Sequence, residues 1–153
     1  MMSKGNSVNA DFDDDKVSML QSGAELLASV LVPNGFAFEV LGSGKGSGGL
    51  FAFGQFKRGE RRLEFHFRYS LGMVCYHLGP CSMSHEDYMH AVLGERHVSK
   101  YPGFSNQPMD GFRDLFSDLQ EHGADFLTGT DECLLQLIEK ANLLAKTRPR
   151  LPE

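Results

Sequence analysis

The chain has 153 residues, of which 41% are hydrophobic and 23% are charged, as is typical of one globular domain with a substantial core. Its net charge of −5 argues against nucleic-acid binding, which needs a basic surface, and no apolar run reaches the length of a membrane helix, about 20 residues. Three cysteines form no disulfide framework, and the N-terminus lacks the apolar core of a secretory signal, so we expect a cytoplasmic protein.

The first expected element is a helix that ends at Leu31. Acidic residues from Asp11 to Asp15 favour the positive end of a helix, and apolar residues follow at helical spacing. Pro33-Asn34-Gly35 is a typical helix stop.

Four strands are expected next, over residues 36–41, 50–57, 61–69 and 73–78. Arg58-Gly59 and Leu71-Gly72 are the expected tight turns, because each offers a glycine for a positive φ. The glycine- and serine-rich residues 42–49 are expected to form a loop. Such short links predict an antiparallel meander.

Two-residue turns at those positions fix a register by counting. Phe53 would then lie opposite Glu64 and Phe51 opposite His66, while His77 would also lie opposite His66. The expected core face holds Leu50, Ala52, Leu63, Phe65, Phe67, Tyr69, Val74, Tyr76 and Leu78. The opposite face holds Phe51, Phe53, Glu64, His66, Arg68, Cys75 and His77, with Cys75 opposite Arg68. A slip of one residue would exchange the two faces.

Three helices are expected in the second half of the chain. Ser84 and Asp87 have the spacing of a capping box, a second helix begins near Asp110 and stops at Gly123, and a third follows Thr130. We therefore predict an α+β fold with an N-terminal helix, a four-stranded antiparallel meander sheet and three helices packed on one sheet face. Its expected parts are a disordered tail (1–10), a single domain (11–146) and a C-terminal tail (147–153).

The polar sheet face is the candidate functional surface, and several interpretations remain open. An ordinary solvated face explains its charges, whereas Phe51 and Phe53 favour a surface that recognises a protein partner, with Glu64 and Arg68 to orient it. A small-molecule pocket would form if a helix or the 42–49 loop closed over this face, with Arg68 holding an anionic group. A second copy of the chain could also cover it.

The histidines of this face raise metal, acid–base and pH-sensing hypotheses. Zinc accepts ligands such as His66, His77 and Cys75, but no standard ligand spacing is present, so we expect no metal and no cofactor. An enzyme would use His66 or His77 as its acid or base. Cys75 as a nucleophile would need His77 as its base, and a contact between the two histidines would respond to pH.

The remaining motifs are expected to be structural. Residues 44–49 match GxGxxG, but a strand follows where the dinucleotide motif needs a helix. His77, Cys81 and His85 recur at regular spacing, yet His85 falls at a helix start. The remaining expectations are surface positions for His90, His97 and His122 and a small core position for Cys133.

Four segments together carry a family resemblance: the strand over 62–69, Val74-Cys75-Tyr76-His77, the helix start over 84–88 and the turn over 101–105. In this order they resemble small bacterial α+β domains of unknown function of the toxin-immunity type. The resemblance implies a non-enzymatic cytoplasmic protein that binds a protein partner, and it implies no shared functional residues. We expect a protein partner or a homodimer, with no nucleic acid and no membrane; the alternative is a small-molecule-binding domain or enzyme that uses the same face.

Overall fold

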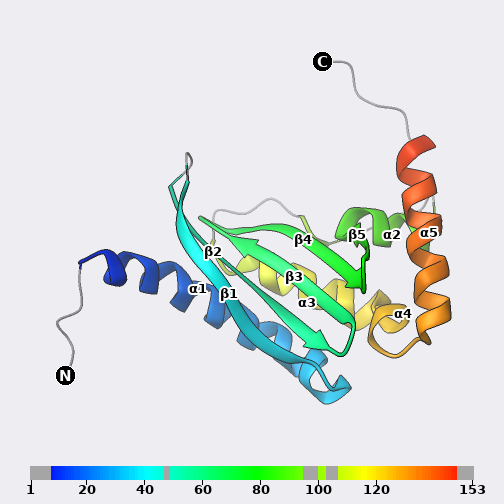
Figure 1. Ribbon diagram of the computed structural model, residues 1–153, viewed down its shortest axis with the longest axis horizontal. Coiled ribbons are helices and arrows are strands. Elements are labelled where there is room, and N and C mark those ends of the chain that lie inside the picture. The colour runs from blue at the N-terminus through cyan, green and yellow to red at the C-terminus, as the bar shows by residue number, and fades with distance from the viewer. Residues whose placement is uncertain (1–7, 47–48, 95–99, 103–106, 148–153) are drawn as a thin grey trace.

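The protein has the predicted α+β architecture in the computed structural model, which describes residues 8–46, 49–94, 100–102 and 107–147 (Figure 1). The helices are α1 (Val8–Leu31), the 3₁₀ turn η1 (Val32–Asn34), α2 (His85–Leu93), α3 (Asp110–His122), α4 (Ala124–Leu127) and α5 (Asp131–Thr147). The strands are β1 (Ala37–Gly46), β2 (Gly49–Arg58), β3 (Arg61–Phe67), β4 (Leu71–Leu78) and β5 (Cys81–Ser84). Residues 8–10 and Thr147, expected in the tails, belong to α1 and α5, and the rest of both tails lies outside the described residues.

The sheet is an antiparallel meander of five strands in the order β1-β2-β3-β4-β5, one strand more than predicted. The additional strand, β5, pairs with β4 from Leu78↔Cys81 to Cys75↔Ser84. Gly79 makes the intervening turn with a φ of +58°. A segment as short as β5 carries no readable alternation of polar and apolar residues.

The first strand is longer than expected, because residues 42–46 continue β1 and do not form a loop. Their glycines leave room for aromatic rings: a Cβ at Gly42 would lie 3.0 Å from the Phe53 ring, and one at Gly44 would lie 3.2 Å from the Phe51 ring. The prediction that residues 42–49 form a lid over the polar face is therefore wrong for residues 42–46 and for Gly49, which belong to strands. Residues 47–48 lie outside the described part of the chain.

The β2–β3 register differs from the prediction by two residues. The turn lies at Gly59-Glu60, because Arg58 pairs with Arg61 and Gly59 supplies the positive φ of +60°. Phe53 consequently lies opposite His66, not opposite Glu64. A shift by an even number of residues leaves every side chain on its predicted face, because strand side chains alternate with a period of two.

The β3–β4 register differs by four residues and contains a bulge. Cys75 lies opposite Glu64 and His77 opposite Arg62, so neither Arg68 nor His66 faces its predicted partner. The shift falls between Phe65 and Phe67, where Gly72 and Met73 oppose the single residue His66. 

The bulge also changes one member of the core. Tyr69, expected in the core, is 68% exposed, and Leu71 is buried opposite Phe67 in its place. The chain bends after Phe67, so the predicted alternation ends before it reaches Tyr69.

The helices cover one face of the sheet. In Figure 1, α1 and α3 lie behind the strands, and α2 and α5 lie beside β5 at one end. Phe65 is fully buried between sheet and helix, where its ring meets those of Phe56 and Phe112. No described helix crosses the other sheet face, which we call the open face. Among the described residues, none of the helices combines the length and apolarity needed to span a membrane.

The predicted signals for helix ends are confirmed in part. Gly35 ends η1 with a φ of +92°, and the Ser84 hydroxyl accepts a hydrogen bond from the Asp87 N–H at 3.1 Å. The four-residue helix α4 was not predicted. Cys133 is exposed on α5 and is not a core residue as expected.

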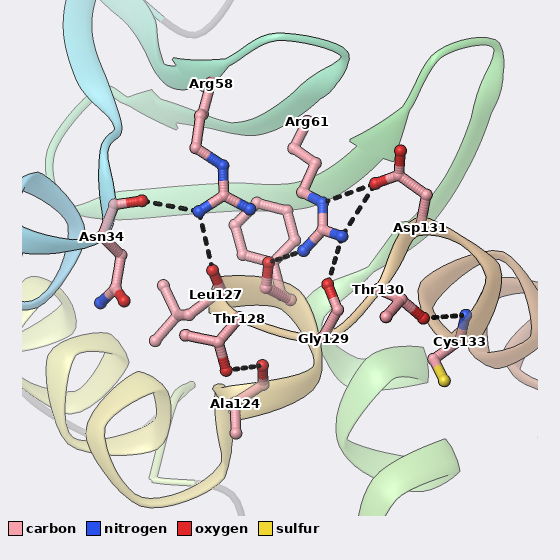
Figure 2. Close-up of polar contacts among 11 residues, drawn as sticks. Asn34, Arg58, Arg61, Ala124, Leu127, Thr128, Gly129, Thr130, Asp131 and Cys133 are labelled. Carbon is pink, nitrogen blue, oxygen red and sulfur yellow. Dashed lines mark hydrogen bonds and ion pairs between the residues drawn. The ribbon is translucent and has the colours of Figure 1, made fainter.

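Two arginines of the β2–β3 hairpin attach the C-terminal helices to the sheet (Figure 2). Arg58 donates to the carbonyl oxygens of Asn34 at 2.6 Å and Leu127 at 2.9 Å. Arg61 donates to the carbonyls of Phe126 at 2.7 Å and Gly129, and it pairs with Asp131 at 2.9 Å. These bonds satisfy carbonyls near the C-terminal ends of η1 and α4, which have no partners within their own helices.

Candidate functional site on the open face

The seven side chains predicted for the polar surface lie together on the open face. Each is partly buried, and β2, β3 and β4 supply six of them. The set is Phe51, Phe53, Glu64, His66, Arg68, Cys75 and His77. Arg68 follows the end of β3, where its N–H donates to the Ser70 carbonyl, yet its guanidinium still lies over the Phe51 ring.

Glu64 is at the centre of the polar contacts. Its Oε2 accepts from His66 Nε2 at 3.0 Å, and its Oε1 accepts from His77 Nε2 at 3.0 Å. Because a carboxylate only accepts, both neutral histidines carry their proton on Nε2. The predicted direct His66–His77 contact is therefore replaced by a carboxylate that bridges them.

The charges around His77 act in opposite directions on its protonation. Burial lowers the pKa of His77, and the nearby Arg62 guanidinium lowers it further, whereas Glu64 raises it. Burial raises the pKa of the Cys75 thiol, and the charges of Glu64 and Asp87 add to that rise. The Cys75 thiol is therefore protonated at neutral pH, which disfavours the nucleophile hypothesis.

The histidines and Cys75 do not assemble into a metal centre. Among the described residues, no group of three or more His, Cys, Asp or Glu side chains has an arrangement that could hold a metal ion. Each oxygen of Glu64 already accepts a hydrogen bond from one histidine.

Three stacked rings form what we call the aromatic shelf: Phe51, Phe53 and His66. The centroids of Phe51 and Phe53 are 6.2 Å apart, and those of Phe53 and His66 are 4.9 Å apart with an interplanar angle of 11°. The Arg68 guanidinium lies 5.8 Å from the centroid of Phe51. The shelf rests on the glycines of β1, so its rings lie along the sheet surface.

An open depression of about 390 Å³, which we call the hollow, adjoins the shelf. Its lining residues are Phe51, His66, Phe67, Arg68, Ser70 and Gly72. The bulge in β4 places Gly72 beside His66, where the missing side chain leaves space. Bulges are frequent next to binding and active sites because they redirect the neighbouring side chains.

A second polar row on the open face lies outside the predicted set of site residues. Gln55 Nε2 donates to Glu39 Oε1 at 2.8 Å, and Arg62 donates to Gln55 Oε1 at 3.3 Å. Gln55 is only 5% exposed, so these bonds satisfy a buried amide. The sequence signal for Gln55 was its position two residues after Phe53 in the same strand, which places both side chains on the same face.

A buried polar network was also missed, and it lies on the helix side of the sheet. His85 is 3% exposed and Asp118 is 1% exposed. The Tyr76 hydroxyl donates to His85 Nδ1 at 2.7 Å, and His85 Nε2 donates to Asp118 Oδ2 at 2.8 Å. Asp118 also accepts from the N–H groups of Lys100 and Tyr101.

This network fixes the helix start without adding to the open face. Both ring nitrogens of His85 are occupied, so it is a core residue as well as the first residue of α2. Burial raises the pKa of Tyr76 well above its usual value, which keeps the hydroxyl proton available for His85. His77 and His85 therefore have separate partners, and the regular spacing of His77, Cys81 and His85 does not make a site. 

The described parts of the other sequence motifs contribute no side chain to this site. Gly44 and Gly46 belong to β1 and Gly49 begins β2, so the GxGxxG match is followed by a strand, as expected. His90 and His122 are partly buried. His97 and residues 103–105 of the expected turn lie outside the described residues.

The function of this surface has to be inferred from its own geometry, because no similar protein was found. Comparison with protein-family models, with curated proteins and with solved structures finds no match for this chain.

Proposed function

We propose that this chain is a non-enzymatic binding protein that recognises a protein partner through its open sheet face. The observation that carries the proposal is the aromatic shelf: large rings lie partly exposed beside Glu64 and Arg68 on a face that no described helix covers. Aromatic residues and arginine are enriched in protein interfaces, where they contribute most of the binding energy.

The chemistry of the same residues favours binding over catalysis. Glu64 accepts a hydrogen bond from each histidine, and Cys75 keeps its thiol protonated. The hollow is open to solvent, whereas an enzyme pocket encloses its substrate and excludes water. A broad, shallow surface with mixed aromatic and charged groups fits a protein partner better than a buried substrate.

An immunity-type role is one form of this proposal, since such a protein acts by covering a partner protein. We place the activity in the cytoplasm, because the three cysteines are all free. The acidic balance of the chain suits a basic partner, although steering by a net charge of −5 is weak.

The test is affinity capture from a lysate of the source organism with tagged wild type and two variants. Phe53→Ala/Arg68→Ala removes the centre of the face, and Leu143→Ala removes a side chain that is 63% exposed on α5, far along the chain from the sheet. We expect one stoichiometric protein with wild type and Leu143→Ala, and its loss with the double variant. Capture that is unchanged by the double variant would contradict the proposed surface.

A homodimer is tested separately by light scattering across a range of concentrations. A dimer that the double variant dissociates would assign the open face to a second copy of the chain. A monomer in every variant keeps the face available for a different protein.

A further inference from the structure

The Arg68 guanidinium lies on the open face against the Phe51 ring. Among the described residues its guanidinium makes no hydrogen bond or ion pair, and its one described side-chain interaction is the contact with the Phe51 ring at 5.8 Å. The side chain also lies close to Gly46, since a Cβ there would be 3.2 Å from Arg68 Nη2. A planar guanidinium held against an aromatic ring is preorganised to bind a carboxylate through two parallel hydrogen bonds.

His66, which also lines the hollow, has a ring nitrogen without a hydrogen bond in the described part of the chain. Its Nε2 donates to Glu64, which leaves the lone pair of Nδ1 without a hydrogen bond among the described residues. A neutral His66 can therefore only accept through Nδ1. If the ring takes up a proton, Nδ1–H becomes a donor while Nε2–H remains bonded to Glu64.

We propose that the hollow binds a carboxylate side chain of the protein partner through Arg68 and a protonated His66, so that binding takes up one proton. This inference rests on the proposed function and specifies the chemistry of its partner. It predicts tighter binding at lower pH, because histidine is the side chain that gains its proton between about pH 8 and 5.

The charged and titratable groups on the surrounding strands are consistent with a proton-linked carboxylate. Those that face His66 or its neighbours are Glu39, Arg62, Glu64, Arg68, Cys75, His77 and, on α2, Asp87. A carboxylate bound in the hollow would lie next to both Arg68 and His66, which line it, and would compensate positive charge on either side chain.

The surroundings of the hollow favour a protein side chain over a free small anion. The hollow is open, so it cannot enclose a small ligand on several sides. The Phe51 and Phe53 rings continue from it as an apolar surface. A partner residue next to the carboxylate can cover that surface, whereas acetate or phosphate cannot.

The experiment titrates ¹⁵N-labelled protein with an acetylated and amidated Phe-Glu-Phe-Glu peptide and with its Phe-Gln-Phe-Gln counterpart. Sodium acetate and sodium phosphate are the small-anion arms. We expect the Glu peptide to shift the resonances of His66, Arg68 and Gly72 and to bind several-fold more tightly at pH 5.5 than at pH 7.5, up to the limit of about tenfold that uptake of one proton by an ordinary histidine allows. The Gln peptide should bind at least roughly tenfold more weakly at pH 5.5.

Three variants connect the effect to the named atoms. His66→Gln should remove the pH dependence, and Arg68→Gln should weaken binding roughly tenfold or more, while Arg68→Lys should retain part of the affinity. His122→Gln, which changes a histidine of α3, is the matched control and should behave as wild type. Equal binding of the Glu and Gln peptides, affinity independent of pH, or equal shifts with acetate alone would overturn the inference.

The same variants separate this inference from the proposed function. A captured partner that is lost with Phe53→Ala but kept by both Arg68→Gln and His66→Gln would refute the carboxylate site and leave the protein-binding face standing. Loss of the partner with all three variants supports both the carboxylate site and the protein-binding face, provided that the wild type binds the partner with the same pH dependence as it binds the peptide.

Discussion

At the scale of single residues, the histidine pair and its glutamate show how position determines chemistry. His66 and His77 have the same carboxylate partner, but only His77 lies opposite a guanidinium, that of Arg62. Glu64 therefore holds two rings in one tautomer, while the charge balance differs at each ring. The sequence alone does not distinguish the two histidines. They differ in the residue that lies opposite each of them on the neighbouring strand, Phe53 for His66 and Arg62 for His77.

The first prediction concerns the pKa of His77. Arg62→Gln should raise the pKa of His77 above its wild-type value, because the guanidinium charge disfavours the imidazolium. Glu64→Gln should lower the pKa of His77 below its wild-type value, because the carboxylate favours the imidazolium. NMR titration of the histidine ring protons measures both shifts, with His122 as an internal reference. Shifts of the same sign in the two variants would contradict the assignment of these neighbours.

The sign of the effect on stability follows from the lowered pKa. The unfolded chain has an ordinary histidine, so it binds more protons than the native state between the lowered pKa and about 6.5. His77 therefore costs stability as the pH falls below about 6.5, and this part of the pH dependence should be reduced in Arg62→Gln. Urea unfolding at several pH values measures it.

The second prediction compares two phenylalanines on opposite faces. Phe65→Ala should lower the free energy of unfolding by about 3–5 kcal/mol, because the Phe65 side chain is fully buried among Phe38, Phe56 and Phe112. Phe53→Ala on the open face removes the stacking on the His66 ring, and apart from that loss it should lower the free energy of unfolding by about 1 kcal/mol or less. Urea unfolding distinguishes them, and equal losses would mean that the open face is also core.

At the scale of elements, side chains of one segment fix the position of another. The β2–β3 hairpin binds the ends of η1 and α4 through Arg58 and Arg61, and α3 binds the start of α2 through Asp118 and His85. Both sets of contacts are polar and largely buried, so their loss leaves unsatisfied groups in the interior.

The third prediction compares two arginines that each pair with an aspartate. Arg61→Met should cost about 3 kcal/mol, because Arg61 is buried and its loss leaves the carbonyls of Phe126 and Gly129 without donors. Arg113→Met removes an exposed pair with Asp110 and should cost less than about 1 kcal/mol. Chemical denaturation of both variants measures the difference, and similar costs would show that the Arg61 contacts add nothing beyond a surface ion pair.

The fourth prediction concerns the network beneath α2. Asp118→Asn should cost about 2–3 kcal/mol, because an amide cannot accept from His85, Lys100 and Tyr101 at once. Asp125→Asn on the exposed side of α4 is the matched control and should change stability by less than about 0.5 kcal/mol. Hydrogen exchange at the Tyr101 amide should accelerate in the first variant and not in the control.

At the scale of the whole molecule, the chain is expected to unfold as one unit. The last helix, α5, supplies Leu134, Ile138 and Ala141 to the same core that contains the sheet. The fifth prediction is that a chain ending at Thr130 loses the dispersed NMR spectrum and the cooperative unfolding transition of the full chain. A truncated chain that still unfolds cooperatively would place α5 outside the folding unit.

Much of the architecture could be predicted because alternation and helix signals are local. Period-two patterning assigned the open and core faces correctly from Phe51 to Phe67, although both turns were placed wrongly, since errors of two and four residues preserve the face. Ser84 and Gly35 are recognisable as caps for the same local reason.

The errors occurred where local composition and tertiary packing disagree. The glycines at 42, 44 and 46 look like a loop in the sequence, but they are a strand whose missing side chains admit the rings of the shelf and the Arg68 guanidinium. In the sequence, His85 is recognisable only as a helix-start residue, and its burial depends on Asp118, which is distant in the chain.

By itself, the sequence determined the class of fold, the order of the main elements and the shared sheet face of the seven predicted side chains, because these depend on which residues are apolar and how they alternate. Only the tertiary structure decided that Glu64 bridges two histidines, that Arg68 lies on Phe51 beside a hollow, and that His85 is bonded into the core. Such contacts depend on register, on a bulge and on packing between distant segments. A change of two residues in pairing alters every cross-strand neighbour while it leaves the pattern of polar and apolar residues the same.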